Sequence, residues 1–298
     1  MPQLSVIILS YNTKDITKQC LDALIKSLNV SKLESEIIVL DNASEDSSVE
    51  MLKKYESTKT YPKTKLVFIY NKKNVGYPKG NNQGIKIAKG KYILLLNSDA
   101  LIQNIDWQTL LKYLDNNPQV GVLTVKVNLP IGRIDPASHR GFPTIWNSFY
   151  YFSGLEKILG RIPLIGKYFG GYHLTHLDLQ KIHEIDSPAG AFYFSPRVVL
   201  NKVKGFDDKN FFLYGEDLDL SYRIKELGYE VIYYPFYTTL HLKHASGLKK
   251  KNTKIRSKSR EYFYESMKIF YRKHYERTHP WFINKLVYFA IDLKKKFS

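Results

Sequence analysis

Four short, mostly apolar runs in the first hundred residues constrain the fold of this chain more than any other feature. They are Leu4–Leu9, Glu36–Leu40, Leu66–Tyr70 and Tyr92–Leu96. Each run has the length of a strand, and none alternates regularly between apolar and polar residues. Strands of this kind are covered on both faces, which is typical of parallel sheets with helices on either side.

Helical patterns separate these runs. Asp15–Leu28 carries apolar residues every three or four positions, Ser47–Tyr55 also has a helical pattern, and Asn81–Ala88 is a short helix that Gly90 ends. This alternation predicts an α/β fold with a mostly parallel central sheet. In such sheets, ligands bind beyond the carboxyl ends of the strands.

Polar clusters follow all four predicted strands. They are Ser10–Asn12, Asp41–Ser44, Asn71–Asn82 and Asn97–Asp99. Asp41 can accept a hydrogen bond from a nucleotide base, although a structural role in a turn is equally open. The glycines of the third cluster match neither a phosphate-binding loop nor a dinucleotide fingerprint, which argues against a kinase or a dehydrogenase.

Two residues are candidates for a metal site. Asp99 places one carboxylate at the mouth of the sheet, and His241 is a candidate second ligand. One carboxylate holds a hard divalent cation only weakly, so we expect substrate phosphate oxygens to complete the site. A single histidine near a strand end is more often structural, and that reading stays open for His241.

Three acidic residues, Glu216, Asp217 and Asp219, follow the aromatic run Phe211–Tyr214. An ionised carboxylate beside bulky apolar groups is costly to bury, but a helix N-terminus lowers that cost. The sequence predicts such a helix over Asp217–Leu227. The acids are therefore either a solvated helix start or functional groups in a pocket, where a general base would have a raised pKa.

The segment 142–172 and the C-terminal fifty residues differ from the rest of the chain. The former is rich in aromatic and aliphatic residues, with Glu156 as its only acid. The latter has 15 Lys and Arg residues against 4 Asp and Glu residues and thus carries most of the net charge of +17. It combines the basic stretch Lys249–Arg260 with predicted helices over Tyr262–Tyr275 and Trp281–Phe297. A basic segment with aromatic residues binds either nucleic acid or anionic lipid.

Composition places the chain in the cytoplasm. It has one cysteine, Cys20, which fits a reducing compartment. The sequence contains no run of ~20 apolar residues, which is the length needed to span a bilayer. No basic region precedes Leu4, so we expect no secretory signal.

Taken together, the sequence blocks resemble family 2 glycosyltransferases, which are inverting enzymes of the GT-A fold, and within them the rhamnosyltransferase-like branch. The matching blocks occur in the order that the family has, over roughly residues 4–247, as Ser5–Asn12, Val39–Ser44, Asn74–Asn81, Leu94–Asp99, Ser187–Ala191, Gly205–Asp207, Phe211–Arg223 and His241 with Ser246. Two positions depart from the family pattern. Asn97 begins the metal motif where an aspartate is usual, and Pro78-Lys79 replaces a small apolar residue.

The resemblance implies a role for each matching residue. Asp217 would be the general base, with Glu216 as the alternative, and Asp99 and His241 would hold Mg²⁺ or Mn²⁺ on the donor diphosphate. The donor-binding residues would be Ser10, Tyr11, Asn12, Asp41, Asn42, Asn74, Gly76, Asn81, Asn97, Ser98, Asp99, Gly190 and Ala191. Gly190 and Ala191 would lie at the junction of donor and acceptor.

The resemblance also implies partners. We expect a nucleotide-sugar donor, with dTDP-rhamnose as the first guess and UDP-sugars as the second, and a glycan or polyprenyl-diphosphate-linked acceptor in cell-surface polysaccharide synthesis. The alternatives are a nucleotidyltransferase, although Ser10–Lys14 lacks its usual triphosphate loop, and a nucleic-acid-binding protein that uses the basic stretch.

We expect a catalytic domain over residues 1–248, with the aromatic insertion 142–172, and a basic helical tail over 249–298. The amphipathic pattern of the tail and its lysine clusters predict peripheral attachment to an anionic membrane surface, on the cytoplasmic face. Alternatively, both apolar segments pack on the catalytic domain or on a second copy of the chain in a homodimer.

Overall fold

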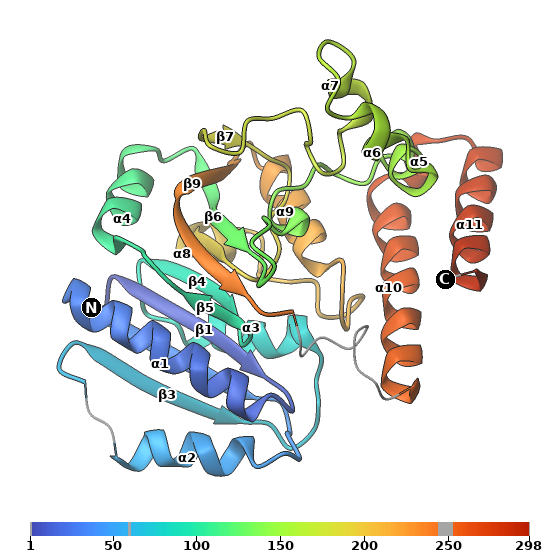
Figure 1. Cartoon of the computed structure of the whole chain (residues 1–298). Helices are drawn as coiled ribbons and strands as arrows, with labels where there is room; N and C mark the ends of the chain where they lie inside the picture. The colour runs from blue at the N-terminus through green and yellow to red at the C-terminus, as the bar shows by residue number, and fades with distance from the viewer. Residues whose placement is uncertain (1, 59–60, 244–252, 298) are drawn as a thin grey trace.

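The computed structural model describes residues 2–58, 61–243 and 253–297, and Ser246 of the last sequence block lies outside them. The described residues form a nine-stranded mixed sheet (Figure 1). Its strands, in spatial order, are β3 (Thr64–Tyr70), β2 (Ser35–Asp41), β1 (Leu4–Ser10), β4 (Tyr92–Asn97), β8 (Tyr193–Pro196), β6 (Val120–Asn128), β9 (Glu230–His241) and β5 (Ala100–Ile102), and β7 (His183–Glu184) also pairs with β9.

The first half of the sheet is the predicted part. Strands β3, β2, β1 and β4 are parallel to one another, and all four predicted strands are confirmed. In the second half, β8 is antiparallel to β4 and β6, while β6 and β9 run parallel. The predicted α/β fold is thus confirmed, with a mixed sheet in which antiparallel strands extend the parallel part.

Helices cover both faces of the sheet. The described helices are α1 (Lys14–Ser31), α2 (Ser48–Thr58), α3 (Tyr77–Ile87), α4 (Trp107–Asn116), α5 (Ile145–Ser153), α6 (Leu155–Leu159), α7 (Gly166–Phe169), α8 (Arg197–Lys202), α9 (Glu216–Glu226), α10 (Thr253–His274) and α11 (Trp281–Lys296), with short 3₁₀ turns η1 (Pro136–Ser138) and η3 (Glu276–Thr278). Helices α1, α2 and α4 bury one face, and α3, α8 and α9 bury the other. The sheet therefore has a core on each side.

Two helices begin several residues earlier than their sequence patterns predicted. Helix α3 begins at Tyr77 rather than Asn81, because Pro78 fits the first turn of a helix. Helix α10 begins at Thr253 rather than Tyr262, so part of the basic stretch is helical. Helix α9 begins at Glu216, with all three acids of the aromatic-acidic motif in its first turn.

The apolar insertion and the C-terminal helices lie together, away from α1 and α2 (Figure 1). Phe142 packs on Phe270 of α10, and Lys294 of α11 lies 5.3 Å from the centre of the Phe152 ring in α5. Helix α10 is also bound to α9, because Asp219 forms ion pairs with Lys273 and His274 at 2.7 and 2.8 Å. Among the helices that the structure describes, none has the length and hydrophobicity that a membrane span requires.

Candidate active site

A large cavity of about 2110 Å³ lies beyond the carboxyl ends of β1, β2 and β4 and continues between α5, α10 and α11. Small-molecule sites usually measure about 300–1,000 Å³, so this cavity has room for two substrates. The structure brings most of the predicted site residues to its wall. They are Tyr11, Asn42, Asn74, Gly76, Asn97, Ser98, Asp99, Gly190, Glu216, Asp217 and His241.

Five other predicted residues, Ser10, Asn12, Asp41, Asn81 and Ala191, do not line the cavity. Ser10 is buried with its hydroxyl 2.9 Å from that of Thr17, and the Asn81 amide donates to the Tyr77 carbonyl at 2.9 Å. Ala191 is buried in the core. These residues pack against or hydrogen-bond to the segments that carry the cavity-lining side chains. A direct contact between them and the donor stays a prediction.

The loops after β1 and β2 are tied to each other. The Asn12 backbone N–H donates to Ser44 Oγ at 2.8 Å, and the Ser44 N–H donates to Asp41 Oδ2 at 2.9 Å. Asp41 Oδ1 is buried and accepts no hydrogen bond from the described part of the chain. Asp41 lies behind the cavity wall in this structure, and its predicted hydrogen bond to a base N–H stays a prediction.

Asn42 organises the next part of the wall. Its side-chain amide donates to Asn74 Oδ1 at 2.9 Å, and its oxygen accepts from Asn71 and from the Val75 backbone, both at 3.1 Å. The loop that follows β3 is thereby fixed against the end of β2. Asn42 and Asn74 therefore lie together on the cavity wall.

Asn97, the residue that departs from the family pattern, has a defined partner. Its side-chain oxygen accepts a hydrogen bond from the Tyr77 hydroxyl at 2.9 Å, and its backbone N–H donates to the Gly190 carbonyl at 3.1 Å. A Cβ at Gly190 would lie 2.4 Å from that hydroxyl, so any larger residue there would have to displace the Tyr77 side chain. Tyr77 was not predicted as a site residue, because its partner is twenty positions away in sequence.

Asp99 and His241 are in contact, so the two side chains are close enough to share one cation. His241 Nε2 is 3.1 Å from Asp99 Oδ1, and His241 Nδ1 is 2.9 Å from Asp135 Oδ2. Asp135 also forms an ion pair with Lys243 at 2.7 Å, so Asp99, His241, Asp135 and Lys243 are linked one after another. Burial lowers the pKa of His241, but its bonds to the two carboxylates outweigh that effect and raise the pKa to about 9.

These residues fit part of a divalent cation site. A carboxylate oxygen and an imidazole nitrogen, both on the cavity wall, suit Mg²⁺ or Mn²⁺ when the His241 ring gives up a proton in exchange for the metal and phosphate oxygens and water supply the other ligands. Within the described ranges, no group of three or more His, Cys, Asp or Glu side chains forms a complete metal cluster. The donor set is therefore a partial one that a bound diphosphate would complete.

Asp135 was not predicted from the sequence. It accepts hydrogen bonds from the Ala137 backbone at η1 and from His241, which lies 106 positions away. The Asp-Pro pair that starts this turn is the only local signal, and it gives no indication of the histidine. In the structure Asp135 fixes the orientation of the His241 ring, as residues behind metal ligands commonly do.

The variant Asp135→Asn should therefore weaken Mn²⁺-dependent donor binding about 10-fold or more, because the ring of His241 loses its charged partner. Titration of a nucleotide sugar at fixed Mn²⁺ measures this effect. Asp178→Asn, at an exposed carboxylate, is the matched control and should bind like the unmodified protein. Equal binding by all three proteins would contradict the assigned role.

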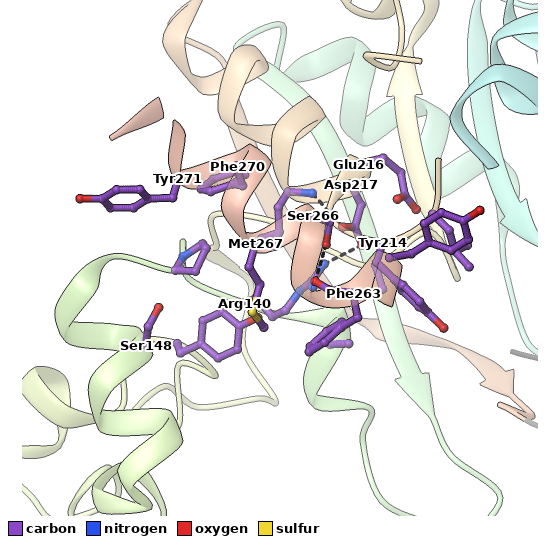
Figure 2. Close-up of a pocket in the computed structure, with 18 of the residues that line it drawn as sticks. Arg140, Ser148, Tyr214, Glu216, Asp217, Phe263, Ser266, Met267, Phe270 and Tyr271 are labelled. Atoms are coloured by element: carbon purple, nitrogen blue, oxygen red, sulfur yellow. Dashed lines mark hydrogen bonds and ion pairs between the residues drawn. The ribbon is translucent and has the colours of Figure 1, made fainter. Parts of the chain in front are cut away.

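Asp217 and Glu216 lie in different surroundings. Asp217 Oδ2 accepts a hydrogen bond from the Arg140 guanidinium at 2.6 Å, and the same Arg140 nitrogen donates to the Pro188 carbonyl at 3.2 Å. Glu216 is buried, and its Oε2 has no partner among the described residues. Figure 2 shows both carboxylates and Arg140 among the residues that line the cavity.

The raised pKa that the sequence predicts for a base in this pocket occurs at Glu216. Burial and the neighbouring charge of Asp217 raise the pKa of Glu216 to about 8. Two neighbouring carboxyl groups in unlike surroundings are a common arrangement in acid–base sites. The third acid, Asp219, is fully buried and is used to hold α10.

Glu216 gives a prediction for stability. Its pKa rises from an ordinary 4.5 to about 8 on folding. The folded chain therefore binds the extra proton between these values, and stability falls as pH rises through this window. Glu216→Gln cannot ionise, so it should melt at a higher temperature than the unmodified protein at pH 8.5, with a much smaller difference at pH 5.

The control is the exposed Glu226→Gln on the same helix. A difference independent of pH would contradict this assignment.

Comparison with known proteins agrees with the geometry. The model described as Glycosyl transferase family 2 matches residues 5–177. A poly(ribitol-phosphate) beta-glucosyltransferase of Bacillus spizizenii is 32% identical over 142 residues, which cover 47% of this chain and 20% of the relative. A poly-beta-1,6-N-acetyl-D-glucosamine synthase of Staphylococcus epidermidis is 24% identical over 232 residues, covering 78% and 48%. The chain thus spans less than half of either relative.

Solved structures show the same fold. The mannosyltransferase PcManGT of Pyrobaculum calidifontis, in complex with GDP-Man and Mn²⁺, has a TM-score of 0.57 at 17% identity, with 91% of this chain and 64% of that one covered. Residues 1–349 of S. aureus TarS, in complex with UDP-GlcNAc, have a TM-score of 0.55 at 20% identity, with 90% and 65% covered. At these identities the likeness extends to the fold alone.

Proposed function

This chain belongs to glycosyl transferase family 2, and from that membership we propose that it transfers a sugar, with inversion, from a nucleotide-diphosphate donor to an acceptor hydroxyl. One observation carries the proposal. The asparagine-rich wall, the Asp99–His241 pair and the carboxyl groups of α9 all line one continuous cavity. A donor and an acceptor can therefore meet between the metal residues and a base.

Each part of the cavity has a proposed task. Asn42 and Asn74 shape the nucleotide end, and Asp99 and His241 face the diphosphate. A bound Mg²⁺ or Mn²⁺ would supply positive charge for the departing nucleoside diphosphate. Asp217 accepts the proton of the acceptor hydroxyl, whose oxygen bonds to the anomeric carbon while the bond from that carbon to the diphosphate breaks. Arg140 holds the Asp217 carboxylate in place by its 2.6 Å contact.

For the donor and the acceptor we propose chemical classes rather than single compounds. dTDP-rhamnose remains the first candidate donor, and the UDP-GlcNAc complex of TarS supports UDP-sugars as the second. The names of the relatives support a cell-surface polymer or its precursor as acceptor, and a polyprenyl-diphosphate-linked glycan is our proposed form.

A thermal-shift screen of nucleotide sugars with Mn²⁺ tests the donor. The true donor at ~100 times its Kd should stabilise the fold by about 2.7 kcal/mol. The transfer reaction should then release a nucleoside diphosphate. Release of pyrophosphate from a nucleoside triphosphate would identify a nucleotidyltransferase instead. Salt-sensitive binding of DNA or RNA without any transfer would favour the nucleic-acid-binding alternative.

We also propose that the protein attaches peripherally to the cytoplasmic face of a membrane. Phe282 and Phe289 on the outer side of α11 are 56% and 62% exposed, and Trp146 of α5 is 65% exposed. The Lys294–Lys296 cluster ends α11. Exposed aromatic groups beside lysines provide the two signals that stable surface binding needs.

Liposome co-sedimentation tests this attachment. The unmodified chain should pellet with anionic vesicles at low salt and be released as salt rises, since each juxtamembrane lysine contributes ~1 kcal/mol. The double variant Phe282→Ser and Phe289→Ser should remain in the supernatant. These exposed positions are preferable to truncation at Gly247, which would also remove α10 from its contacts with α9. An unmodified chain that stays in the supernatant at low salt would refute the attachment.

A further inference from the structure

The cavity continues past Glu216 and Asp217 into a part that a nucleotide sugar does not need. We name this part the apolar channel. Its wall is formed by three helices, through Ile145, Trp146, Phe149 and Phe152 of α5, Phe263, Met267 and Phe270 of α10, and Ile283, Leu286, Val287, Ala290 and Ile291 of α11. Figure 2 shows Phe263, Met267 and Phe270 in the same cavity as the two carboxylates. The channel is thus continuous with the proposed site of transfer.

We propose that the apolar channel holds the hydrocarbon chain of an isoprenyl diphosphate that carries the acceptor sugar, an inference that rests on the proposed function. The first support is the shape of α11. Its channel-lining residues, from Ile283 to Lys294, are separated alternately by three and one positions, which places them on one face of the helix. That face extends about 16 Å along the axis, at ~1.5 Å per residue. A strip of this length suits an extended chain.

The second support is the charge at the channel. Lys258 of α10 and Lys294 of α11 line it, and each lies over an aromatic ring, Tyr262 at 5.9 Å and Phe152 at 5.3 Å. No ion pair with a carboxylate occurs at either lysine within residues 2–58, 61–243 and 253–297. They are therefore free to pair with an anionic group. Apolar walls with unneutralised lysines match a ligand that joins a hydrocarbon chain to a diphosphate.

Other occupants fit less well. A glycan would need polar partners along the channel, where aliphatic and aromatic side chains predominate. A diacyl lipid would have to place two chains in a single channel between three helices. An isoprenyl diphosphate has one chain, and its charged end would lie between that chain and the carboxyl group that activates the sugar hydroxyl.

Isothermal titration of farnesyl diphosphate, without any donor, tests the channel. Farnesyl diphosphate should bind at least ~10-fold more tightly than inorganic diphosphate, because the chain adds buried apolar area. Ala290→Trp fills the channel from α11 and should reduce that affinity at least ~10-fold. The matched control is Leu293→Trp, on the same helix at an exposed position that does not line the cavity, which should bind like the unmodified chain.

A second variant covers the case in which Ala290→Trp does not fold, as judged by its melting temperature. Lys258→Ala alters an exposed side chain and should weaken binding of farnesyl diphosphate at least ~3-fold. Farnesol lacks the diphosphate, so its affinity should be the same for Lys258→Ala and for the unmodified chain. The inference would be overturned if farnesyl diphosphate bound no better than inorganic diphosphate. It would also be overturned if both channel variants and the control bound farnesyl diphosphate with equal affinity. The proposed transfer function would survive that result, since donor binding and release of nucleoside diphosphate test it separately.

Discussion

Asp217→Asn is expected to reduce the turnover of sugar transfer at least ~100-fold while donor affinity changes little. Asparagine keeps the volume of the side chain but cannot take a proton from the acceptor hydroxyl. Stopped assays with the donor identified by thermal shift measure turnover, and titration of the donor measures its affinity. Because Arg140 loses a charged partner at 2.6 Å, the melting temperature of the variant is the necessary control.

Glu216 is the competing base, and its raised pKa of about 8 strengthens that alternative. A carboxyl group with this pKa is poised to exchange protons near neutral pH. Glu216→Gln separates the two assignments. Near-normal turnover in Asp217→Asn together with an inactive Glu216→Gln would move the base to Glu216.

The second large effect concerns the metal. Asp99→Ala and His241→Ala should each weaken Mn²⁺-dependent donor binding by ~100-fold or more, beyond the loss expected for Asp135→Asn, because both are proposed to touch the cation itself. Asp135 keeps its ion pair with Lys243 at 2.7 Å when His241 is removed, so the surrounding structure has a remaining support. Donor titrations with and without Mn²⁺ measure the effect. Full transfer activity in excess EDTA would contradict the metal-dependent reading.

The first half of the fold was predictable because its signals are local. Uninterrupted apolar runs with helices between them identify parallel strands from composition and order alone. The strands β5 and β7 have only three and two residues, and β8 has four. Such short segments are defined by pairing with distant strands rather than by their own sequence, which is why the antiparallel extension was not predicted.

The candidate site was predicted where residues come directly after a strand. Asp99, Asn42 and Asn74 line the cavity for this reason. Arg140 and Asp135 were missed, because their partners Asp217 and His241 lie 77 and 106 positions away. The pKa of Glu216 is raised by its burial and by the neighbouring charge of Asp217, and the sequence alone does not show how deeply Glu216 is buried.

The contact between α9 and α10 determines where hybrid enzymes can be joined. Asp219 is fully buried, forms ion pairs with Arg223 of its own helix and with Lys273 of α10, and is also in hydrogen-bond contact with His274 of α10. A chimera that takes its C-terminal helices from another glycosyltransferase at residue 248 would leave this carboxylate without two of its three partners. Loss of a partner from a buried ion pair commonly costs about 3–5 kcal/mol. Exchange of acceptor preference by domain grafting should therefore place the junction after His274, so that α10 stays with its native α9.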